Sequence, residues 1–395
     1  MTRADSGGRV LVVGGGIGGI AAAVSLRQRG FEVLVIEKRP AFDIPGVGLG
    51  QPANALRVYD RLGVLGDILE VGYSYDRMRY LDWDAELLVE HRFLMGGDGV
   101  PAFSALPRSD LHRILLDAAE RAGVETRLGC EVSELSQTPD GVDVRFSDDR
   151  EERFSLAVGF DGIRSATRRR AFGEAFEPTD SGYGAWRIQV PRPAEVDAME
   201  FYQGIGGKTG AIPLRGDLMY LFHIGRATSG PDGGHDATVR EFIARLRGYS
   251  GYIGEVRDSL TIDSDVVYSR LEPSLLPPPW HRGRVVLGGD AAHTVPPHLT
   301  QGAALAVEDG WVLADELARD QPIDEALTNY SERRFARCAF VLAFASQMLA
   351  GEQAVSTADE LEAARHDITR HASTRLGTAD RVMDASIERG ARSWR

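Results

Sequence analysis

Three glycines near the N-terminus, Gly14, Gly16 and Gly19, constrain the fold of this chain more than any other feature. They follow an apolar run at 9–13, which predicts a short buried strand, and they open an alanine-rich stretch, which predicts a helix. A second apolar run follows at 31–36. Strand, glycine turn, helix and second strand together predict a βαβ unit of Rossmann type.

The βαβ unit also predicts a binding site for a dinucleotide. Glycines in the turn let the backbone approach a pyrophosphate, and the positive end of the following helix neutralises it. Glu37 stands at the end of the second predicted strand, where a carboxylate accepts hydrogen bonds from a ribose diol. This turn alone does not distinguish FAD from NAD.

A second loop far downstream separates the two cofactors. Residues 288–293 follow a predicted strand at 284–287 and precede a predicted helix that starts near Gly302. One dinucleotide needs only one glycine turn, so a second strand–loop–acid element indicates an extended cofactor that reaches across the domain. Asp290 can bind a polyol such as ribityl, and the N-terminus of the helix favours a developing anion such as a reduced flavin ring. The alternative is an ordinary connection between a strand and a helix.

Composition excludes several classes of protein. A net charge of −13 over 395 residues argues against a nucleic-acid partner. Two cysteines, Cys130 and Cys338, exclude a disulfide scaffold and favour a cytoplasmic location. No apolar run is long enough for a membrane span. The histidines show no ligand spacing, and no metal site is expected.

Five segments, taken together, resemble one family. They are the glycine turn with Glu37 and Arg39; residues 46–49 with 52–54; Arg108 within 107–111; residues 158–162 with Ser165 and Arg168; and residues 289–293 with Pro296 and Pro297. In these segments the chain resembles the single-component (class A) FAD-dependent aromatic hydroxylases, which include para-hydroxybenzoate, salicylate, 3-hydroxybenzoate and urate hydroxylases. The resemblance extends over about residues 8 to 340.

The resemblance implies an α/β fold in which a Rossmann-like FAD-binding domain carries an inserted, mostly antiparallel β-sheet substrate domain and a C-terminal helical segment. Short alternating strands at 183–190, 198–202, 218–224 and 260–268 agree with the insertion. The expected parts of each domain are as follows: the FAD-binding domain at 1–75, 101–180 and 271–330, the substrate domain at 76–100 and 181–270, and the C-terminal helices at 331–395.

The resemblance also implies tight, non-covalent FAD and assigns residues to it. Glu37 would bind the adenosine ribose, Arg39 and Arg108 would lie near the ribose and pyrophosphate, and Asp290 would hold the ribityl and pyrophosphate region. Asp161 would serve both FAD and the transient reductant. The expected FAD-binding residues are Gly14, Gly16, Gly19, Glu37, Lys38, Arg39, Val47, Gly48, Arg108, Asp161, Asp290, Gly302 and Ala303.

The activity that the resemblance implies is a monooxygenase reaction. NAD(P)H would reduce the flavin transiently, O2 would form a flavin C4a-hydroperoxide, and a small aromatic or electron-rich heterocyclic substrate would be hydroxylated. The alternatives are another FAD-dependent oxidoreductase on the same scaffold and a flavin-binding protein without turnover. The protein is expected to be a monomer or a homodimer.

The substrate pocket is expected between the inserted sheet and the flavin. Pro296 would lie beside the reacting edge of the flavin, and Arg187 could pair with a substrate carboxylate. Tyr220 and His223, a possible general base, lie on opposite faces of one strand, so only one of them can line the pocket. The candidate catalytic residues are Pro296, Gln301, His223, Tyr220 and Arg187, with Phe222 and His298 as further pocket candidates.

Three positions depart from familiar patterns. Thr300 stands where the family often has glycine, so it would be strained if that position needs a positive φ. Phe160 replaces the usual small residue before Asp161 and is expected to alter packing near the nicotinamide path. Lys208 ends a partial phosphate-loop pattern, but Tyr202 occupies the place of its first glycine, so that pattern fails.

Overall fold

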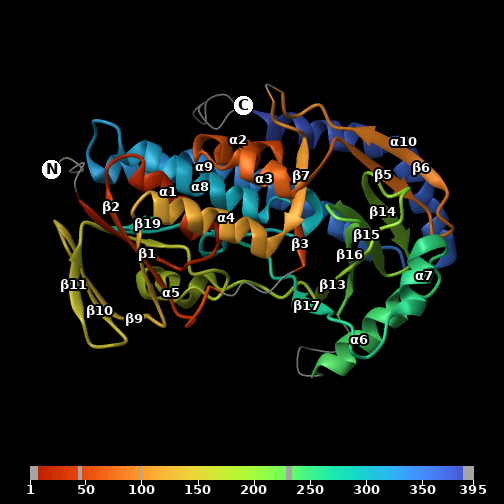
Figure 1. Cartoon of the computed structure of the whole chain (residues 1–395), viewed down its shortest axis with the longest axis horizontal. Coiled ribbons are helices and arrows are strands. Elements are labelled where there is room, and N and C mark those ends of the chain that lie inside the picture. The colour runs from red at the N-terminus through yellow and green to blue at the C-terminus, as the bar shows by residue number, and fades with distance from the viewer. Residues whose placement is uncertain (1–7, 43–46, 98, 228–233, 386–395) are drawn as a thin grey trace.

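Two large sheets organise the chain, one toward each end of its long axis (Figure 1). The structure is a computed structural model that describes residues 8–42, 47–97, 99–227 and 234–385, so Gly46 of the family pattern lies outside the described residues. The first sheet is mostly parallel and the second mostly antiparallel, which confirms the predicted α/β fold class. In the described ranges, no helix combines the length and apolar character needed to cross a membrane.

The first sheet places three loops of the chain at one edge. Its central strand pairs in parallel on both sides, and every other strand runs in the same direction except His281–Arg282, which lies at one edge. The carboxyl ends of parallel strands meet at one edge, so the glycine turn, residues 160–162 and residues 288–290 come together there. The strand order is β19 (His281–Arg282), β20 (Val285–Leu287), β12 (Leu156–Gly159), β1 (Arg9–Val13), β2 (Glu32–Glu37) and β8 (Glu125–Leu128).

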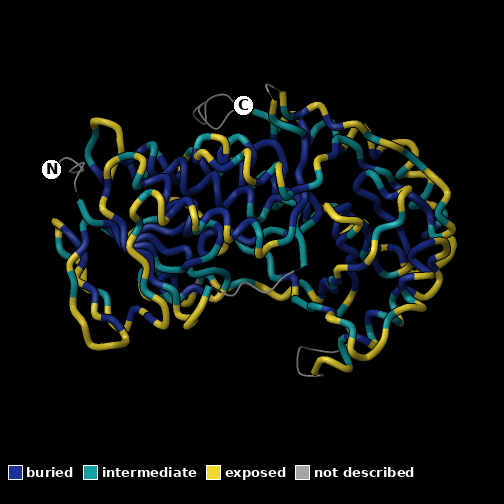
Figure 2. Tube along the Cα trace, viewed as in Figure 1, coloured by how far each residue is buried: buried dark blue, intermediate teal, exposed yellow. Residues whose placement is uncertain are grey.

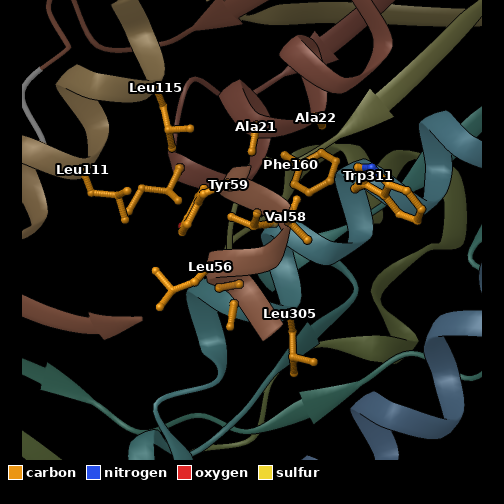
Figure 3. Packing of buried hydrophobic residues seen from close by; sticks show 14 of the residues in the cluster. Ala21, Ala22, Leu56, Val58, Tyr59, Leu111, Leu115, Phe160, Leu305 and Trp311 are labelled. Atoms are coloured by element: carbon orange, nitrogen blue, oxygen red, sulfur yellow. The ribbon is translucent and has the colours of Figure 1, made fainter. Parts of the chain in front are cut away.

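Helices α1 (Ile17–Arg27) and α8 (Gly302–Leu317) pack closely against each other beside this sheet. A Cβ atom on Gly310 would lie 2.6 Å from the Cα of Ala22, so only glycine permits this approach. Figure 3 shows the core in which Ala21, Ala22, Tyr59 and Trp311 lie. The other helices around it are α2 (Ala53–Arg61), α3 (Leu65–Val71), α4 (Arg108–Arg121), α5 (Ala166–Phe172) and α9 (Ile323–Gln353).

The second sheet has seven strands and two different faces. On β16, Tyr220 and Phe222 belong to the main core, whereas Leu221 packs with Trp186 and Phe242 under α6 (Gly234–Arg245) and α7 (Gly251–Ser259). Every strand pair is antiparallel except β14 with β5. The order is β17 (Val267–Arg270), β13 (Tyr183–Pro191), β16 (Leu218–Arg226), β15 (Gly207–Leu214), β14 (Met199–Gly204), β5 (Arg77–Leu81) and β6 (Leu87–Arg92).

Smaller elements complete the chain. The boundaries between the FAD-binding domain and the substrate domain stay a prediction. A hairpin sheet of three strands lies at one end of the molecule, with many exposed residues (Figure 2). Helix α10 (Ala358–Asp384) contacts β6 and β14. The small strands are β9 (Val132–Thr138), β10 (Gly141–Phe146), β11 (Glu151–Phe154), β3 (Gly48–Pro52), β7 (Phe103–Pro107), β4 (Tyr73–Tyr75), β18 (Ser274–Leu275) and β21 (His293–Thr294).

One predicted strand differs from the structure. The expected strand at 260–268 begins only at Val267 and is preceded by α7, which ends at Ser259. Strand β15 was not predicted. Its glycines and Pro213 are uncommon in strands, and because it is buried along its whole length it shows no alternation of apolar and polar residues.

Candidate functional site

The three glycines of the turn have different roles. Gly14 has φ +110°, and a Cβ atom there would lie 2.4 Å from the carbonyl oxygen of Phe160. A Cβ atom on Gly19 would lie 2.0 Å from the carbonyl oxygen of Gly14. Gly16 has no atom within 4 Å of its Cβ position, and it lines a cavity. Gly14 and Gly19 therefore serve the packing of the turn, whereas Gly16 leaves space for a ligand.

Glu37 holds the turn against the end of β2. Its carboxylate accepts hydrogen bonds from the backbone N–H groups of Gly15 (2.9 Å) and Arg39 (3.0 Å). On the other side, Nε2 of buried His112 lies 2.7 Å from the carbonyl oxygen of Gly15. The sequence analysis missed His112, which stands one helical turn after Arg108 on α4 without any motif of its own.

A cavity of about 610 Å³ extends from the glycine turn to the second sheet. Its walls come from both sheets and from the loop that precedes α8, so residues far apart in sequence meet there. Twelve of the predicted residues line it, namely Gly16, Val47, Gly48, Arg108, Arg187, Tyr220, Phe222, Asp290, Pro296, His298, Gly302 and Ala303.

Two charged side chains in this cavity lack a protein counter-ion. Within the described part of the chain, neither Arg108 nor Asp290 forms an ion pair or a side-chain hydrogen bond, and both are exposed to the cavity. Burial raises the pKa of Asp290, with His293 and Arg108 acting in the opposite direction. Burial likewise lowers the pKa of Arg108, with Asp290 opposing it. A guanidinium and a carboxylate are thus available to a bound molecule.

Several expected FAD-binding residues lie outside this cavity. Glu37, Lys38 and Arg39 lie at and just beyond the end of β2, beside the glycine turn. Asp161 accepts hydrogen bonds from Oγ of Ser165 (2.5 Å) and from the backbone N–H of Thr167 (2.9 Å). Its carboxylate therefore stabilises the start of α5, and its expected contact with FAD and the reductant stays a prediction.

The structure corrects two candidates for substrate contact. His223 faces away from the cavity, with Nδ1 3.1 Å from Oγ1 of Thr209, and burial lowers its pKa to about 3. Gln301 is fully buried, where its amide exchanges hydrogen bonds with Asn54 (3.1 and 3.3 Å). Because neither residue is part of the cavity wall, the expectation that they contact the substrate is wrong for this cavity.

The two unusual residues have clear structural consequences. Thr300 has φ +55°, so the threonine does adopt the left-handed conformation that disfavours branched side chains. The ring of Phe160 fills space left by glycines, because Cβ atoms on Gly18, Gly288 and Gly289 would lie 2.5 to 3.2 Å from it. Phe160 thereby packs the two glycine loops against each other and lines the cavity.

Asp309 of α8 secures the second loop. It accepts hydrogen bonds from the backbone N–H of Gly289 (2.8 Å), from Nε2 of His293 (2.6 Å) and from Nε of Arg334 (2.6 Å). Burial acts to raise the pKa of Asp309, but His293 and Arg334 outweigh it and hold the pKa at about 2. Cys338 lies close enough to complete a possible metal-ligand set, yet a cation there would adjoin the Arg334 guanidinium. We therefore assign this group a structural role.

Comparisons with known proteins agree with this geometry. The sequence model described as FAD binding domain matches residues 8–345. The chain is 33% identical over 342 residues to a putative FAD-dependent monooxygenase, YetM, of Bacillus subtilis, covering 86% of this chain and 92% of that protein. It is 29% identical to 3-hydroxybenzoate 6-hydroxylase 1 of Aquipseudomonas alcaligenes, covering 84% and 86%. HpxO of Klebsiella pneumoniae, solved with FAD and uric acid, shares the fold with a TM-score of 0.83 at 24% identity over 97% of each chain.

The described residues fit FAD. Gly16 leaves open space at the N-terminus of α1, Arg108 and Asp290 are unpaired at the cavity, and no side chain caps α1. These features suit a pyrophosphate and a ribityl chain. With a family match over 8–345 and relatives that are named monooxygenases, this chain belongs to the class A family of FAD-dependent monooxygenases that hydroxylate aromatic compounds.

Proposed function

We propose that this protein binds FAD without a covalent bond, accepts electrons from NAD(P)H, and inserts one atom of O2 into a small aromatic or electron-rich heterocyclic compound. The observation that carries the proposal is the single cavity that joins the glycine turn and Asp290 to the aromatic face of the second sheet. A cofactor at one end of this cavity would meet a substrate at the other.

The residues present suggest how FAD would be held. Glu37 would bind the adenosine ribose, with Lys38 and Arg39 beside it. Gly16 and the N-terminus of α1 would receive the pyrophosphate together with Arg108. Asp290 would bind the ribityl hydroxyls, and the flavin ring would lie along the backbone of Val47, Gly48, Gly302 and Ala303 beside Pro296. Bound FAD supplies the electron transfer from NAD(P)H and the activation of O2.

The substrate end of the cavity suits a flat ring. Phe201, Tyr220 and Phe222 line it from the second sheet and are almost fully buried. Arg187 donates hydrogen bonds to Oη of Tyr220 (3.0 Å) and to Oγ of Ser269 (2.6 Å). Among the described residues, no carboxylate pairs with Arg187. Its guanidinium therefore offers a positive charge to an acidic substituent on the ring.

The test measures turnover by the purified protein loaded with FAD. Oxidation of NADH and NADPH is followed with 3-hydroxybenzoate, 3-amino-4-hydroxybenzoate, uric acid and alkylquinolones, chosen from the substrates or products that the names of relatives and solved structures print. We expect at least one compound to stimulate oxidation and to gain one oxygen atom by mass. Stimulated oxidation without oxygen insertion would indicate another FAD-dependent oxidoreductase. No oxidation with any compound would indicate a flavin-binding protein without turnover.

A further inference from the structure

The register of the second sheet determines which side chains form the floor of the cavity. Arg187 of β13 pairs with Phe222 of β16, and Phe222 pairs in turn with Gly210 of β15. On its other side, Gly210 pairs with Phe201 of β14. Because paired residues of neighbouring strands share one face of a sheet, a single row runs across the floor from Arg187 to Phe201. Neighbouring strands lie about 4.8 Å apart, so this row is roughly 14 Å long.

The two ends of this row differ in exposure. Beside Arg187 lies the edge strand β17, where Ser269 is half-buried and Arg270 is exposed, and both line the cavity. At the far end, Phe201 is only 3% exposed and Ile212 of β15 is 2% exposed. Both of these side chains also line the cavity. The cavity is therefore open beside β17 and closed by apolar side chains toward β14.

Free charge is confined to the open end. Arg187 donates hydrogen bonds to two neutral hydroxyl groups, and none of the described carboxylates pairs with it. The other charged side chains that line this half of the cavity form ion pairs, namely Lys208 with Glu352 (2.7 Å), Arg270 with Asp180, and Glu272 with Arg164 (2.6 Å). The substrate end thus presents one uncompensated guanidinium, which favours a carboxylate on the ligand.

The polar atoms at the apolar end are closed to the cavity. Nζ of Lys208 and Nδ1 of His298 are both buried, and Nε2 of His298 lies 3.0 Å from Oε2 of Glu352. Burial and Lys208 lower the pKa of His298, with Glu352 opposing them, so the imidazole carries no charge at pH 7. A group bound at this end would therefore meet carbon atoms and no free charge.

Between these two ends, the floor is aromatic and adjoins the loop assigned to the flavin. The rings of Tyr220 and Phe222 lie 5.4 Å apart, with an angle of 33° between their planes. A Cβ atom on Gly48 would lie 3.3 Å from the Cβ of Tyr220. A substrate ring held over these two side chains would therefore lie beside the backbone along which the flavin is proposed to bind.

We propose that the substrate is an aromatic acid that carries an apolar substituent on the side of its ring opposite the acid group. This inference rests on the proposed function. The acid group would pair with Arg187, the ring would lie on Tyr220 and Phe222, and the substituent would reach Ile212 and Phe201. The row from Arg187 to Phe201 is longer than an acid with one ring, and an alkyl chain would fill the remainder. Ile212 would then determine the preferred length of the chain.

The first experiment measures binding without turnover. The FAD-loaded protein is titrated in a calorimeter with benzoate and with 4-alkylbenzoates from methyl to hexyl, and a flavin difference spectrum confirms that each compound binds beside the cofactor. Each buried CH2 group should lower Kd about fourfold. We expect this gain to continue until the chain reaches Phe201, after which longer chains should bind no better. Affinity that is unchanged by the chain, or that falls from benzoate onward, would overturn the proposal.

Two further series of compounds separate the acid group from the chain. The 2-alkylbenzoates contain the same atoms but carry the chain beside the acid group, so they should gain much less from each carbon. The 4-alkylbenzamides keep the chain but lack the charge, and they should bind about 10-fold more weakly than the acids. In Arg187→Gln this preference for the acid should disappear while the gain from the chain remains. Equal gains for the 2-alkyl and 4-alkyl series would contradict the proposed orientation.

A matched pair of variants then tests the role of Ile212. Ile212→Ala adds space at the apolar end, so the chain that binds most tightly should become longer, whereas benzoate itself should bind about as well as before. Ile188→Ala is the control, because Ile188 is equally apolar and buried but packs on the opposite face of the sheet. It should leave the preferred chain unchanged. If the alanine variant does not fold, Ile212→Val tests the same shift. The same preferred chain in the Ile212 variant and in the unaltered protein would overturn this role.

Turnover separates this inference from the proposed function. If the protein prefers long 4-alkylbenzoates but hydroxylates no compound, the binding site stands and the proposed function fails. If it hydroxylates aromatic compounds, 2-hydroxy-4-pentylbenzoate should have a kcat/KM at least about 10-fold higher than salicylate, because the buried chain adds binding energy. Hydroxylation that favours salicylate over its alkyl derivative would overturn the inference and leave the proposed function intact.

Discussion

At the scale of single residues, Gly16 is a position where no contact within the described protein requires glycine. Its φ is −76°, which any residue adopts, and no protein atom lies near its Cβ position. Gly14, in contrast, is required by its own backbone conformation and by the carbonyl group of Phe160. The same motif therefore contains two glycines that the packing of the turn requires, Gly14 and Gly19, and one that leaves open space, which sequence spacing alone does not distinguish.

We predict that Gly16→Val folds but loses FAD. The valine methyl groups would occupy the space where the pyrophosphate approaches α1, and the loss of charge-assisted hydrogen bonds should weaken FAD roughly 10- to 100-fold. Isothermal titration with the apoprotein measures this affinity. Gly66→Val on α3 is the control, because Gly66 also has open space around its Cβ position but lies outside the cavity. Equal losses in both variants would contradict the assignment.

Thr300 stores strain in the loop before α8. A branched side chain at φ +55° is unfavourable by about 1–2 kcal/mol, and part of the gain from removing it is offset by the freedom of glycine in the unfolded chain. Thr300→Gly should therefore raise Tm by roughly 1–3 °C. Thr300→Ala, which keeps a Cβ atom, should fall between the two in a thermal melt. A lower Tm for Thr300→Gly would show that the contacts of the threonine side chain stabilise the fold by more than its backbone strain destabilises it.

The sequence predicted candidate residues better than it predicted their surroundings. Alternation along β16 correctly implied that only one of Tyr220 and His223 could line the pocket, but the choice depended on which face α6 and α7 cover. Gln301 stands next to cavity residues, yet its side chain turns inward to Asn54. Glu352 had no local signal, because its partners are supplied by elements more than fifty residues away.

At the scale of secondary-structure elements, α8 anchors the loop at residues 288–293 through one carboxylate. Asp309 joins Gly289 and His293 of the loop to Arg334 of α9, and all of its partners are donors. Glu308 beside it pairs with Arg334 and Arg337. Helices α8 and α9 therefore share a buried network whose charges are mutually dependent.

We predict that Asp309→Asn is strongly destabilising. The amide retains the shape of the carboxylate but loses the charge that balances Arg334, and its NH2 group would face a donor. Breaking a buried pair in this way costs about 3–5 kcal/mol, measured by urea unfolding. Asp315→Asn on the same helix removes a carboxylate that is partly exposed and pairs with Arg319 and Arg333, and it should cost less because water can replace part of the lost contacts. Comparable losses would mean that burial does not distinguish the two sites.

Acid should weaken the attachment of α9 to the second sheet. Burial acts to raise the pKa of Glu352, but Lys208 and His298 hold it at about 2, below the ordinary 4.5. A depressed pKa stabilises the fold above about pH 4.5, and this contribution, on the order of 3 kcal/mol, is lost as the pH falls toward 2. The urea concentration at the midpoint of unfolding is measured between about pH 4.5 and pH 2. It should fall less steeply for the Lys208→Met, Glu352→Gln double variant than for the unaltered protein. Parallel curves would contradict the prediction.

Element prediction was most successful where the pattern was local. The glycine turn, with its two flanking strands and α1, was recovered from the sequence because each part has its own signal. Strand β15 was missed, since its residues are buried on both faces and show no alternation. The expected strand at 260–268 was wrong because its residues do suggest alternation, but most of them form a turn. Only Val267 and Tyr268 belong to a strand, β17, which pairs with β13.

At the scale of the whole molecule, the cavity lies between the two large sheets, whose facing residues belong to one main core. Gly16, Arg108 and Asp290 belong to one side, and Tyr220 and Phe222 to the other. A cofactor that contacts both sides should stabilise them together, because a ligand stabilises whatever structure it needs for binding. Hydrogen exchange of the apoprotein with and without FAD tests this coupling, since it reports the stability of each segment separately.

We predict that FAD slows exchange in β13 and β16 as well as in α1 and the loop before α8. The β9–β11 sheet is the internal control, because the cavity does not extend to it and its exchange should not change. Protection confined to the first sheet would mean that the second sheet closes over the site only when substrate binds. In Gly16→Val the protection at β16 should disappear at the same FAD concentration. The added stability of the second sheet comes from bound FAD, and this variant binds FAD weakly.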